Sequence, residues 1–259
     1  MDTAPPYGAR KGRTQKAGAG WGGRIANLIW PPRSLLSERI VERPGVIEPE
    51  LWLKLRFLTD PLCFRCGFPL PQDEGAEAVC GPCAAQAPAY GRARAALVYD
   101  EHAAKLILDL KRGGRRDGLG AFASWMHAAA GELIAEADVI APAPMHWMRL
   151  AGRTFNQAAW LAQAFSRASG KPWAPEALIR IKKRRSQEGL SASERRRNVA
   201  GAIKASKRAA AGRTVLLVDD VMTTGATADA CANALLKAGA RNVHVATLAR
   251  VVRPQDALI

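Results

Sequence analysis

The sequence predicts an α/β protein with a mostly parallel, Rossmann-like sheet and flanking helices, preceded by a small four-cysteine module. From Arg92 onward, short apolar runs alternate with longer amphipathic segments, the pattern of parallel strands joined by crossover helices. One run, 215–218, is apolar at every position, as expected for a strand covered on both faces. Two Cys-x-x-Cys pairs stand upstream, at 63–66 and 80–83. The remaining predicted elements are strands at 95–99, 138–144, 178–181 and 243–250, and helices at 103–110, 121–135 and 156–169.

The length, composition and charge of the chain indicate what kind of protein it is and which ligands it can attract. Its 259 residues suffice for one good-sized core and a smaller module, and its 48% hydrophobic content is ordinary for a globular protein. The formal net charge of +15 favours polyanions, either nucleic acid or a pyrophosphorylated small molecule. We expect no membrane span, because no run of about 18 apolar residues occurs. The basic N-terminus lacks the apolar segment of a secretory signal, so we expect a cytoplasmic protein.

Changes in composition divide the chain into four segments. Residues 1–24 are rich in Gly, Ala, Pro and basic residues, which predicts a disordered basic tail. Residues 59–88 contain the four cysteines, and residues 92–253 contain the predicted sheet. Residues 25–58 are expected to form short helices whose large apolar side chains need burial, namely Leu51, Trp52, Leu53, Leu55, Phe57 and Leu58.

The four cysteines have the spacing of a zinc site. Cys63 and Cys66 form one knuckle, and Cys80 and Cys83 form another, so four thiolates are available for tetrahedral Zn²⁺. The alternative is that the cysteines are reduced core residues or form a disulfide pair. A zinc site is favoured because this short segment has few apolar residues. Because protein would fill all four positions, we expect a structural zinc ribbon. Cys231 stands apart and is expected to be a small core residue.

An apolar strand, an acidic pair and a hydroxyl-rich turn follow one another over residues 215–227. Asp219 and Asp220 are expected at the carboxyl end of the strand, where open α/β sheets bind their ligands. Carboxylates there suit a sugar diol or a Mg²⁺-bound ligand. The turn leads into a helix predicted over 226–238, whose N-terminus attracts phosphate, and Gly239 suits a left-handed cap. The turn consists of Thr223, Thr224, Gly225, Ala226 and Thr227.

All thirteen positions of this stretch resemble the phosphoribosyl pyrophosphate (PRPP) motif of the type I phosphoribosyltransferases. An ordinary strand–turn–helix of another Rossmann-like domain is the alternative, and it does not explain the acidic pair and the hydroxyls together. The resemblance implies that Asp219 and Asp220, the candidate catalytic residues, contact the ribose hydroxyls of Mg²⁺-bound PRPP. It also implies that residues 223–227 hold the 5′-phosphate and that residues 92–253 form a phosphoribosyltransferase-like domain.

Basic residues cluster in three further stretches. The turn 111–116 is either a solvated loop or an anion site. A second stretch contains His146, Arg149 and Arg153, and forked arginine donors suit a pyrophosphate. For His146, a loop residue that hydrogen-bonds backbone is an equal alternative. The stretch 182–199 lacks apolar anchors, so it is either a solvated loop that attracts nucleic acid or a lid over the ligand. The candidate lid residues are Arg185, Gln187 and Arg197.

Several segments together resemble one family. The four-cysteine module precedes a PRPP core that contains Pro142-Ala143-Pro144-Met145-His146, Arg153-Thr154-Phe155-Asn156-Gln157 and Leu248-Ala249-Arg250. Over residues 62–250 this combination resembles the ComF family, in which a double zinc ribbon precedes an amidophosphoribosyltransferase-like domain linked to DNA uptake in bacterial competence. The resemblance implies PRPP, Mg²⁺ and structural Zn²⁺ as ligands. It further implies a pyrophosphate loop at 143–149 and a lid at 184–197.

Three functions stay open from the sequence. The leading one is an enzyme that transfers the phosphoribosyl group of PRPP to a nucleophile, with release of pyrophosphate. The second is a non-catalytic competence factor that binds single-stranded DNA or a DNA-uptake helicase through its basic surface and zinc module. The third is a PRPP-sensing regulator of nucleotide metabolism. The sequence does not identify the acceptor, and it leaves the oligomeric state open.

Overall fold

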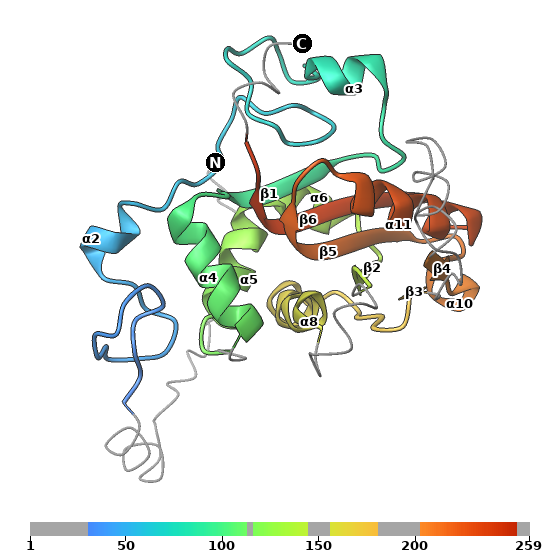
Figure 1. Ribbon diagram of the computed structural model, residues 1–259. Coiled ribbons are helices and arrows are strands. Elements are labelled where there is room, and N and C mark those ends of the chain that lie inside the picture. Colours follow the sequence, from blue (N-terminus) through green and yellow to red (C-terminus); the bar gives the residue numbers. More distant parts are fainter. Residues whose placement is uncertain (1–30, 113–115, 145–155, 181–202, 253–259) are drawn as a thin grey trace, which may run out of the picture.

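A four-stranded parallel sheet forms the centre of the computed structural model, which describes residues 31–112, 116–144, 156–180 and 203–252 (Figure 1). The strand order is β1-β6-β5-β2, and each neighbouring pair in this sheet is parallel. The predicted parallel α/β sheet is therefore confirmed. Its strands are β1 (Ala93–Val98), β2 (Val139–Pro142), β5 (Thr214–Met222) and β6 (Asn242–Arg250).

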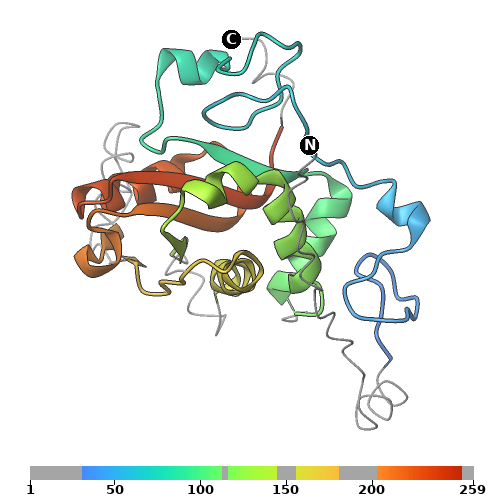
Figure 2. The same cartoon turned by 180° about the vertical axis from the view of Figure 1, so that it is seen from behind.

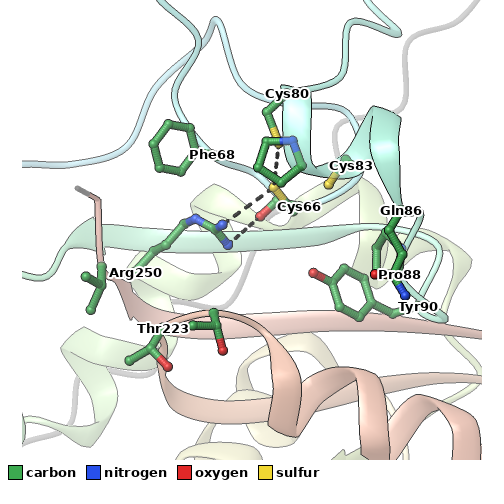
Figure 3. Close-up of a pocket in the computed structure, with 12 residues that line it drawn as sticks. Cys66, Phe68, Cys80, Cys83, Gln86, Pro88, Tyr90, Thr223 and Arg250 are labelled. Carbon is green, nitrogen blue, oxygen red and sulfur yellow. Dashed lines mark hydrogen bonds between the residues drawn. The ribbon is translucent and has the colours of Figure 1, made fainter. Parts of the chain in front are cut away.

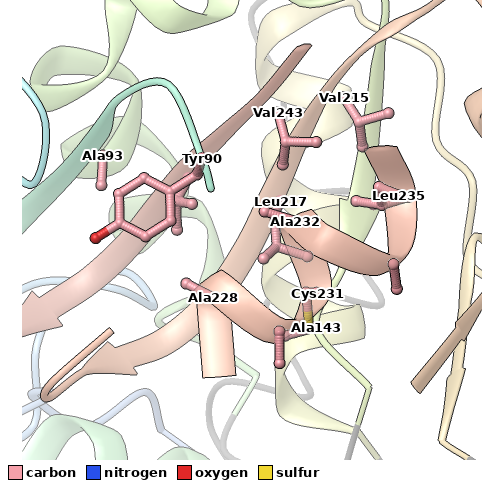
Figure 4. Close-up of a cluster of buried hydrophobic side chains, with 14 of the residues drawn as sticks. Tyr90, Ala93, Ala143, Val215, Leu217, Ala228, Cys231, Ala232, Leu235 and Val243 are labelled. Atoms are coloured by element: carbon pink, nitrogen blue, oxygen red, sulfur yellow. The ribbon is translucent and has the colours of Figure 1, made fainter. Parts of the chain in front are cut away.

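The core lies on both faces of the sheet because side chains of β5 alternate between them. Val215 and Leu217 pack in the same cluster as α11 (Ala226–Lys237), whereas Leu216 and Val218 belong to the cluster on the opposite face. All four side chains are fully buried, which explains why the run is apolar at every position. Figure 4 shows the first of these clusters, with side chains from β5, β6 and α11.

Four helices supply the cluster on the opposite face, and Figures 1 and 2 show them from two sides. The sequence predicts one helix over 121–135, but the structure divides it at Ala130, where the backbone leaves helical geometry (φ −119°, ψ 22°). The next helix begins at Gly131, a residue with low helix propensity, so the break falls where the helix is weakest. The four helices are α4 (Glu101–Arg112), α5 (Leu119–Ala129), α6 (Gly131–Glu136) and α8 (Gln157–Ser169).

Strand β5 is longer than the sequence predicts. The apolar run ends at Val218, but the strand continues through Asp219 and Asp220 to Met222. Pairing with β6 maintains the extended backbone, because Met222 still stands in register with Arg250. The acidic pair therefore lies within the last part of the strand, rather than after it.

The chain before the cysteines packs only in part. Among residues 31–58 one short helix is described, α2 (Pro49–Trp52). Leu55 is buried as predicted, but Leu53 is 83% exposed, so its predicted burial is wrong. Trp52 is also partly exposed and packs its ring against Phe57, with 5.2 Å between the ring centroids. A single helical turn presents one narrow side to the core, so its neighbouring apolar residues face outward.

The cysteine module, residues 59–88, lies against the same face of the sheet as α11 and contains α3 (Gly81–Ala85) (Figures 1 and 2). Gly67 has φ +67°, and a Cβ there would lie 2.5 Å from the carbonyl oxygen of Ala93 in β1. Only glycine combines that backbone angle with so close an approach. The module is therefore packed directly onto the sheet.

An antiparallel pair of short strands completes the described fold. β3 (Leu178–Arg180), which confirms the strand predicted at 178–181, pairs with β4 (Ile203–Ala205) beside α11. A short helix, α10 (Lys207–Ala210), then leads into β5. None of the helices in the described part of the chain combines the length and apolarity needed to cross a membrane.

Candidate functional site

The two carboxylates of the predicted ribose site have different surroundings. Neighbouring residues of a strand point to opposite faces. Asp219 borders α11 together with Thr227, and its Oδ1 accepts a hydrogen bond from the amide of Asp220 at 2.8 Å. Asp220 faces the other way, and its Oδ2 lies 2.7 Å from Nζ of Lys111 in α4. The structure thus offers two carboxylate positions on adjacent residues, one on each side of the strand.

Lys111 is a site residue that the sequence does not single out from its basic turn. The side chains of Lys111 and Asp220 are each only 16% exposed, so this ion pair is largely withdrawn from water. Farther along the same turn, the guanidinium of Arg116 stacks on Trp160 at 4.1 Å from the ring centroid. Lys111 and Arg116 thus both contact the fold, although Arg116 is also exposed to solvent. The basic composition of the turn was the available signal, and it did not indicate which basic residue reaches the acidic pair.

The turn over residues 223–227 presents unpaired backbone amides at the start of α11. Gly225 has φ 78°, a left-handed conformation that turns the chain into the helix. The amide of Ala226 donates to Oγ1 of Thr224 at 3.4 Å. No described residue accepts a hydrogen bond from the amides of Thr224, Gly225 or Thr227. Free amides at a helix N-terminus attract anions, so this turn can receive one phosphate group.

The segment that follows the cysteine module closes one side of this turn. A Cβ added at Gly225 would lie 3.1 Å from the hydroxyl of Tyr90, whose side chain is 4% exposed. Burial raises the pKa of Tyr90 far above its ordinary value, so the hydroxyl stays protonated. The amide of Ala89 donates to Oδ1 of Asp229, in the first turn of α11, at 2.6 Å. The cysteine module and the start of α11 are thus in contact through the consecutive residues Ala89 and Tyr90.

The four cysteines of the module form one buried cluster. Their sulfur atoms all lie within 4.8 Å of one another, and the sulfurs of Cys66 and Cys80 are 3.6 Å apart. In a tetrahedral thiolate site with Zn–S bonds of about 2.3 Å, neighbouring sulfurs are separated by about 3.8 Å. Backbone amides of Cys66 and Cys80 approach the sulfur of Cys63 at 3.5 and 3.3 Å. The cluster, completed by Cys83, therefore has the donor set and the spacing to hold a metal ion.

Arg250 connects this cluster to the sheet. Its Nη1 donates to the carbonyl oxygen of Cys66 at 2.8 Å and to Sδ of Met222 at 2.7 Å. Its Nη2 lies 3.5 Å from Sγ of Cys66, and its guanidinium lies 5.5 Å from the ring centroid of Phe68. The residue is 8% exposed, so its charge stands beside the cysteine sulfurs with little screening by water. The sequence indicated Arg250 only as part of a family motif.

The side chain of Asn156 caps the N-terminus of α8. Its Oδ1 accepts from the amide of Ala158 at 3.0 Å, and its Nδ2 donates to the carbonyl oxygen of Ala143 at 3.2 Å. Six predicted site residues lie outside the described residues. These are His146, Arg149 and Arg153 of the predicted pyrophosphate loop, and Arg185, Gln187 and Arg197 of the predicted lid.

Comparison with known proteins agrees with this architecture. The family model described as phosphoribosyl transferase domain matches residues 157–257. DNA utilization protein YhgH of Escherichia coli O157:H7 is 32% identical over 196 residues, which cover 74% of this chain and 85% of that protein. Competence protein ComFC of Bacillus subtilis (strain 168) is 28% identical over 211 residues, which cover 76% of this chain and 81% of that protein. This chain belongs to the ComF family.

The predicted family resemblance is thereby confirmed for this ComF-family chain, and so is the phosphoribosyltransferase domain. Among solved structures, the glutamine PRPP amidotransferase from B. subtilis, in complex with ADP and GMP, is similar at 26% identity with a TM-score of 0.33. That match covers 50% of this chain and 27% of the amidotransferase chain.

Proposed function

We propose that this ComF-family protein binds PRPP with Mg²⁺ and uses it as a phosphoribosyl donor, with release of pyrophosphate. One observation carries the proposal: unpaired amides and exposed threonines stand at the N-terminus of α11, three residues after an acidic pair. The turn would hold the 5′-phosphate of the donor, and Asp219 and Asp220 would hold its ribose hydroxyls. The phosphoribosyltransferase family model supports this assignment, because it matches residues 157–257, which include the turn and the acidic pair.

The proposed chemistry is displacement at the anomeric carbon of the ribose. The nucleophile forms a bond to that carbon while the bond from carbon to the pyrophosphate oxygen breaks, and the electron pair leaves with pyrophosphate. Mg²⁺, when bound with PRPP, would offset the negative charge of the pyrophosphate. The contribution of the chain is to bind and orient the donor, and no nucleophilic side chain is needed. His146, Arg149 and Arg153 keep their predicted role at the pyrophosphate, and Arg185, Gln187 and Arg197 theirs in a lid that excludes water.

For the cysteine cluster we propose one structural zinc ion. The four sulfurs supply the soft, closed ligand set that zinc prefers in structural sites, and no position is left for a substrate. When bound, the metal would hold the two knuckles together and fix the module on the sheet. A Zn²⁺ ion with four thiolates would carry a net charge of −2, and the neighbouring Arg250 guanidinium favours such a negative centre.

Calorimetric titration of PRPP with Mg²⁺ tests the donor site. We expect the wild type to bind and the double variant Asp219→Asn/Asp220→Asn to lose binding at least tenfold. Asp109→Asn is the matched control, since it removes a carboxylate of α4 that pairs with Lys105 and not with the site. Wild-type protein that takes up no PRPP would contradict the proposal. Loss of binding in the control as well would show that the effect is not specific to the acidic pair.

A second candidate function, binding of single-stranded DNA or a helicase partner, has its own support. The chain carries a formal charge of +15, and relatives are named DNA utilization protein and competence protein. A single-stranded oligonucleotide should then bind with an affinity that falls steeply as salt rises. The two functions are compatible, because the donor site occupies one edge of the sheet. Affinity that does not change with salt would count against this second function.

A further inference from the structure

Arg180, the last residue of β3, has no role in the sites described above. Its partner in β4 is Ile203, and residues that stand opposite each other in an antiparallel pair point to the same face. Ile203 is buried in the cluster that contains α11, as is Leu178, two positions before Arg180. Ile179, between them, is 60% exposed. The pairing and the alternation therefore both direct the Arg180 side chain toward α11.

The β3–β4 pair is oriented so that its Arg180 end points toward the carboxyl end of the sheet. At the other end of the pair Leu178 stands opposite Ala205. From there α10, only four residues long, leads to Thr214 at the amino end of β5. The Leu178 end thus lies near the amino end of the sheet. Asp219 and the start of α11 lie at the opposite end, where α/β sheets bind their ligands.

Cys231 relates Arg180 to the proposed donor site. Its thiol is fully buried in α11 and lies within electrostatic range of both Arg180 and Asp219. Cys231 belongs to the same cluster as Ala143, the residue that follows β2 (Figure 4). The predicted pyrophosphate loop begins at Ala143. Arg180 is therefore close to the carboxyl ends of β2 and β5, on the side of the donor site where the pyrophosphate is expected.

The Arg180 guanidinium is a partly buried cation without a counter-ion among the described residues. Its Nε is buried and has no hydrogen-bond partner, and no described carboxylate forms an ion pair with it. Burial lowers the pKa of Arg180 below its ordinary value, but arginine stays charged at neutral pH. A desolvated charge without a partner is unfavourable, so an anionic ligand that pairs with it gains affinity.

Arg250, which is also buried near the turn 223–227, differs in this respect. Figure 3 shows it beside the cavity between the cysteine module and that turn. Its Nη1 donates to the carbonyl oxygen of Cys66 and to Sδ of Met222, and its Nη2 contacts the sulfur of Cys66. The guanidinium of Arg250 is thus engaged by the protein itself. In the described part of the chain Arg180 has no such contacts and can accept a ligand.

We propose that Arg180 binds the pyrophosphate group of PRPP. The inference rests on the proposed function and adds to its site a residue that the sequence did not indicate. The planar guanidinium can donate two parallel hydrogen bonds to phosphate oxygens. Its charge would stabilise the pyrophosphate as the bond to the anomeric carbon breaks and the electron pair leaves with the pyrophosphate. Because strand pairing fixes the backbone of Arg180, little ordering is needed when the ligand binds.

Calorimetry of the full chain with three Mg²⁺-containing probes tests this contact: PRPP, pyrophosphate and ribose 5-phosphate. Arg180→Gln should weaken PRPP and pyrophosphate at least tenfold and leave ribose 5-phosphate unchanged, because that probe lacks the group that Arg180 holds. Arg180→Lys keeps the charge but not the fork, so its loss should be smaller. Lys204→Gln is the matched control. Lys204 lies in the same strand pair, stands opposite the exposed Ile179 and is itself exposed, so all three affinities should stay at the wild-type value.

The outcomes separate this inference from the proposed function. If the wild type binds PRPP and Arg180→Gln binds pyrophosphate equally well, the inference is overturned and the donor site stands. Equal losses for all three probes, or an equal loss in Lys204→Gln, also overturn it, because they indicate a structural or non-specific effect. Pyrophosphate binding that needs Arg180, in a wild type that takes up no PRPP, supports the inference and overturns the proposed function. A wild type that binds neither overturns both.

Discussion

Nη1 of Arg250, at the end of β6, donates to the carbonyl oxygen of Cys66 at 2.8 Å, so one buried guanidinium joins the sheet to the first cysteine knuckle. The same nitrogen reaches Sδ of Met222, the residue that stands opposite Arg250 in β5 and directly precedes the turn 223–227. The guanidinium therefore links the first cysteine knuckle to the ends of β5 and β6. It helps to hold the cysteine module against the sheet at the carboxyl ends of β5 and β6.

Arg250→Lys should separate the charge of this side chain from its geometry. Lysine keeps the positive charge but cannot form the fork that bonds both Cys66 and Met222. We expect a loss of about 2 kcal/mol in unfolding free energy, because the carbonyl oxygen of Cys66 would lose its partner. Denaturant unfolding measures this, with Arg241→Lys as control, since Arg241 is 65% exposed and pairs with Asp138 at the surface. A control that loses as much stability as Arg250→Lys would contradict the argument.

Removal of the proposed zinc ion should destabilise the cysteine module. Elemental analysis is expected to find one zinc per chain in wild-type protein, and Cys66→Ser is expected to lose it. Cys231→Ala should retain the metal, because Cys231 is a buried core residue of α11 and is not part of the cysteine cluster. Treatment with a strong chelator should lower the melting temperature of the wild type but not that of Cys66→Ser. Full zinc content in Cys66→Ser would refute the four-thiolate site.

Lys111→Met should destabilise the protein through Asp220. Removal of the lysine leaves a largely buried carboxylate without its ion-pair partner, at a cost of about 1–2 kcal/mol. The double variant Lys111→Met/Asp220→Asn should recover part of this loss, because the orphaned charge is gone. Lys105→Met serves as control, since its i,i+4 pair with Asp109 is partly exposed and should contribute less than about 0.5 kcal/mol. Additive single and double variants would show that the pair is not coupled.

Gly225→Ala should impair the proposed phosphate site at residues 223–227 more than it impairs the fold. Its φ of +78° strains any side chain by about 1–2 kcal/mol, and a Cβ would lie 3.1 Å from the Tyr90 hydroxyl. We expect about a tenfold loss of PRPP affinity by calorimetry. Gly212→Ala is a matched control, since Gly212 has φ +69° but nothing within 4 Å of an added Cβ. Gly212→Ala should therefore lose similar stability and keep PRPP affinity; an equal loss of affinity would argue against the site.

His244 should make the fold less stable in mild acid. Its ring is buried in β6, and burial lowers its pKa below the ordinary value, although Glu136, whose Oε2 lies 2.9 Å from Nε2, opposes that shift. Above the unfolded-state pKa of about 6.5 the ring is neutral in both states. As the pH falls below 6.5 the unfolded chain binds the proton first, so the unfolding free energy decreases. Urea unfolding between pH 7.5 and 5.5 should show this slope in the wild type and a flatter one in His244→Gln. His127→Gln, at an exposed position of α5, should keep the wild-type slope.

Local patterns in the sequence determined the main features of the fold. An apolar residue at every position of 215–218 requires cover on both faces, and the structure buries Val215 and Leu217 on one side and Leu216 and Val218 on the other. Two Cys-x-x-Cys pairs determined the cysteine cluster, since each knuckle brings its own two sulfurs together. These predictions succeeded because each depends on residues that are neighbours in the chain.

The tertiary structure alone decided which distant residues complete the site. Lys111 reaches Asp220 across more than one hundred residues, and Tyr90 and Arg250 form opposite walls of one cavity beside Cys66. Strand pairing also decided the length of β5, which continues past its apolar run because β6 continues beside it. No pattern in the sequence specifies these contacts, because they depend on how the sheet, α4 and the module pack together. The sequence by itself therefore determined the elements and the ligand groups within them, and packing decided which of those groups meet.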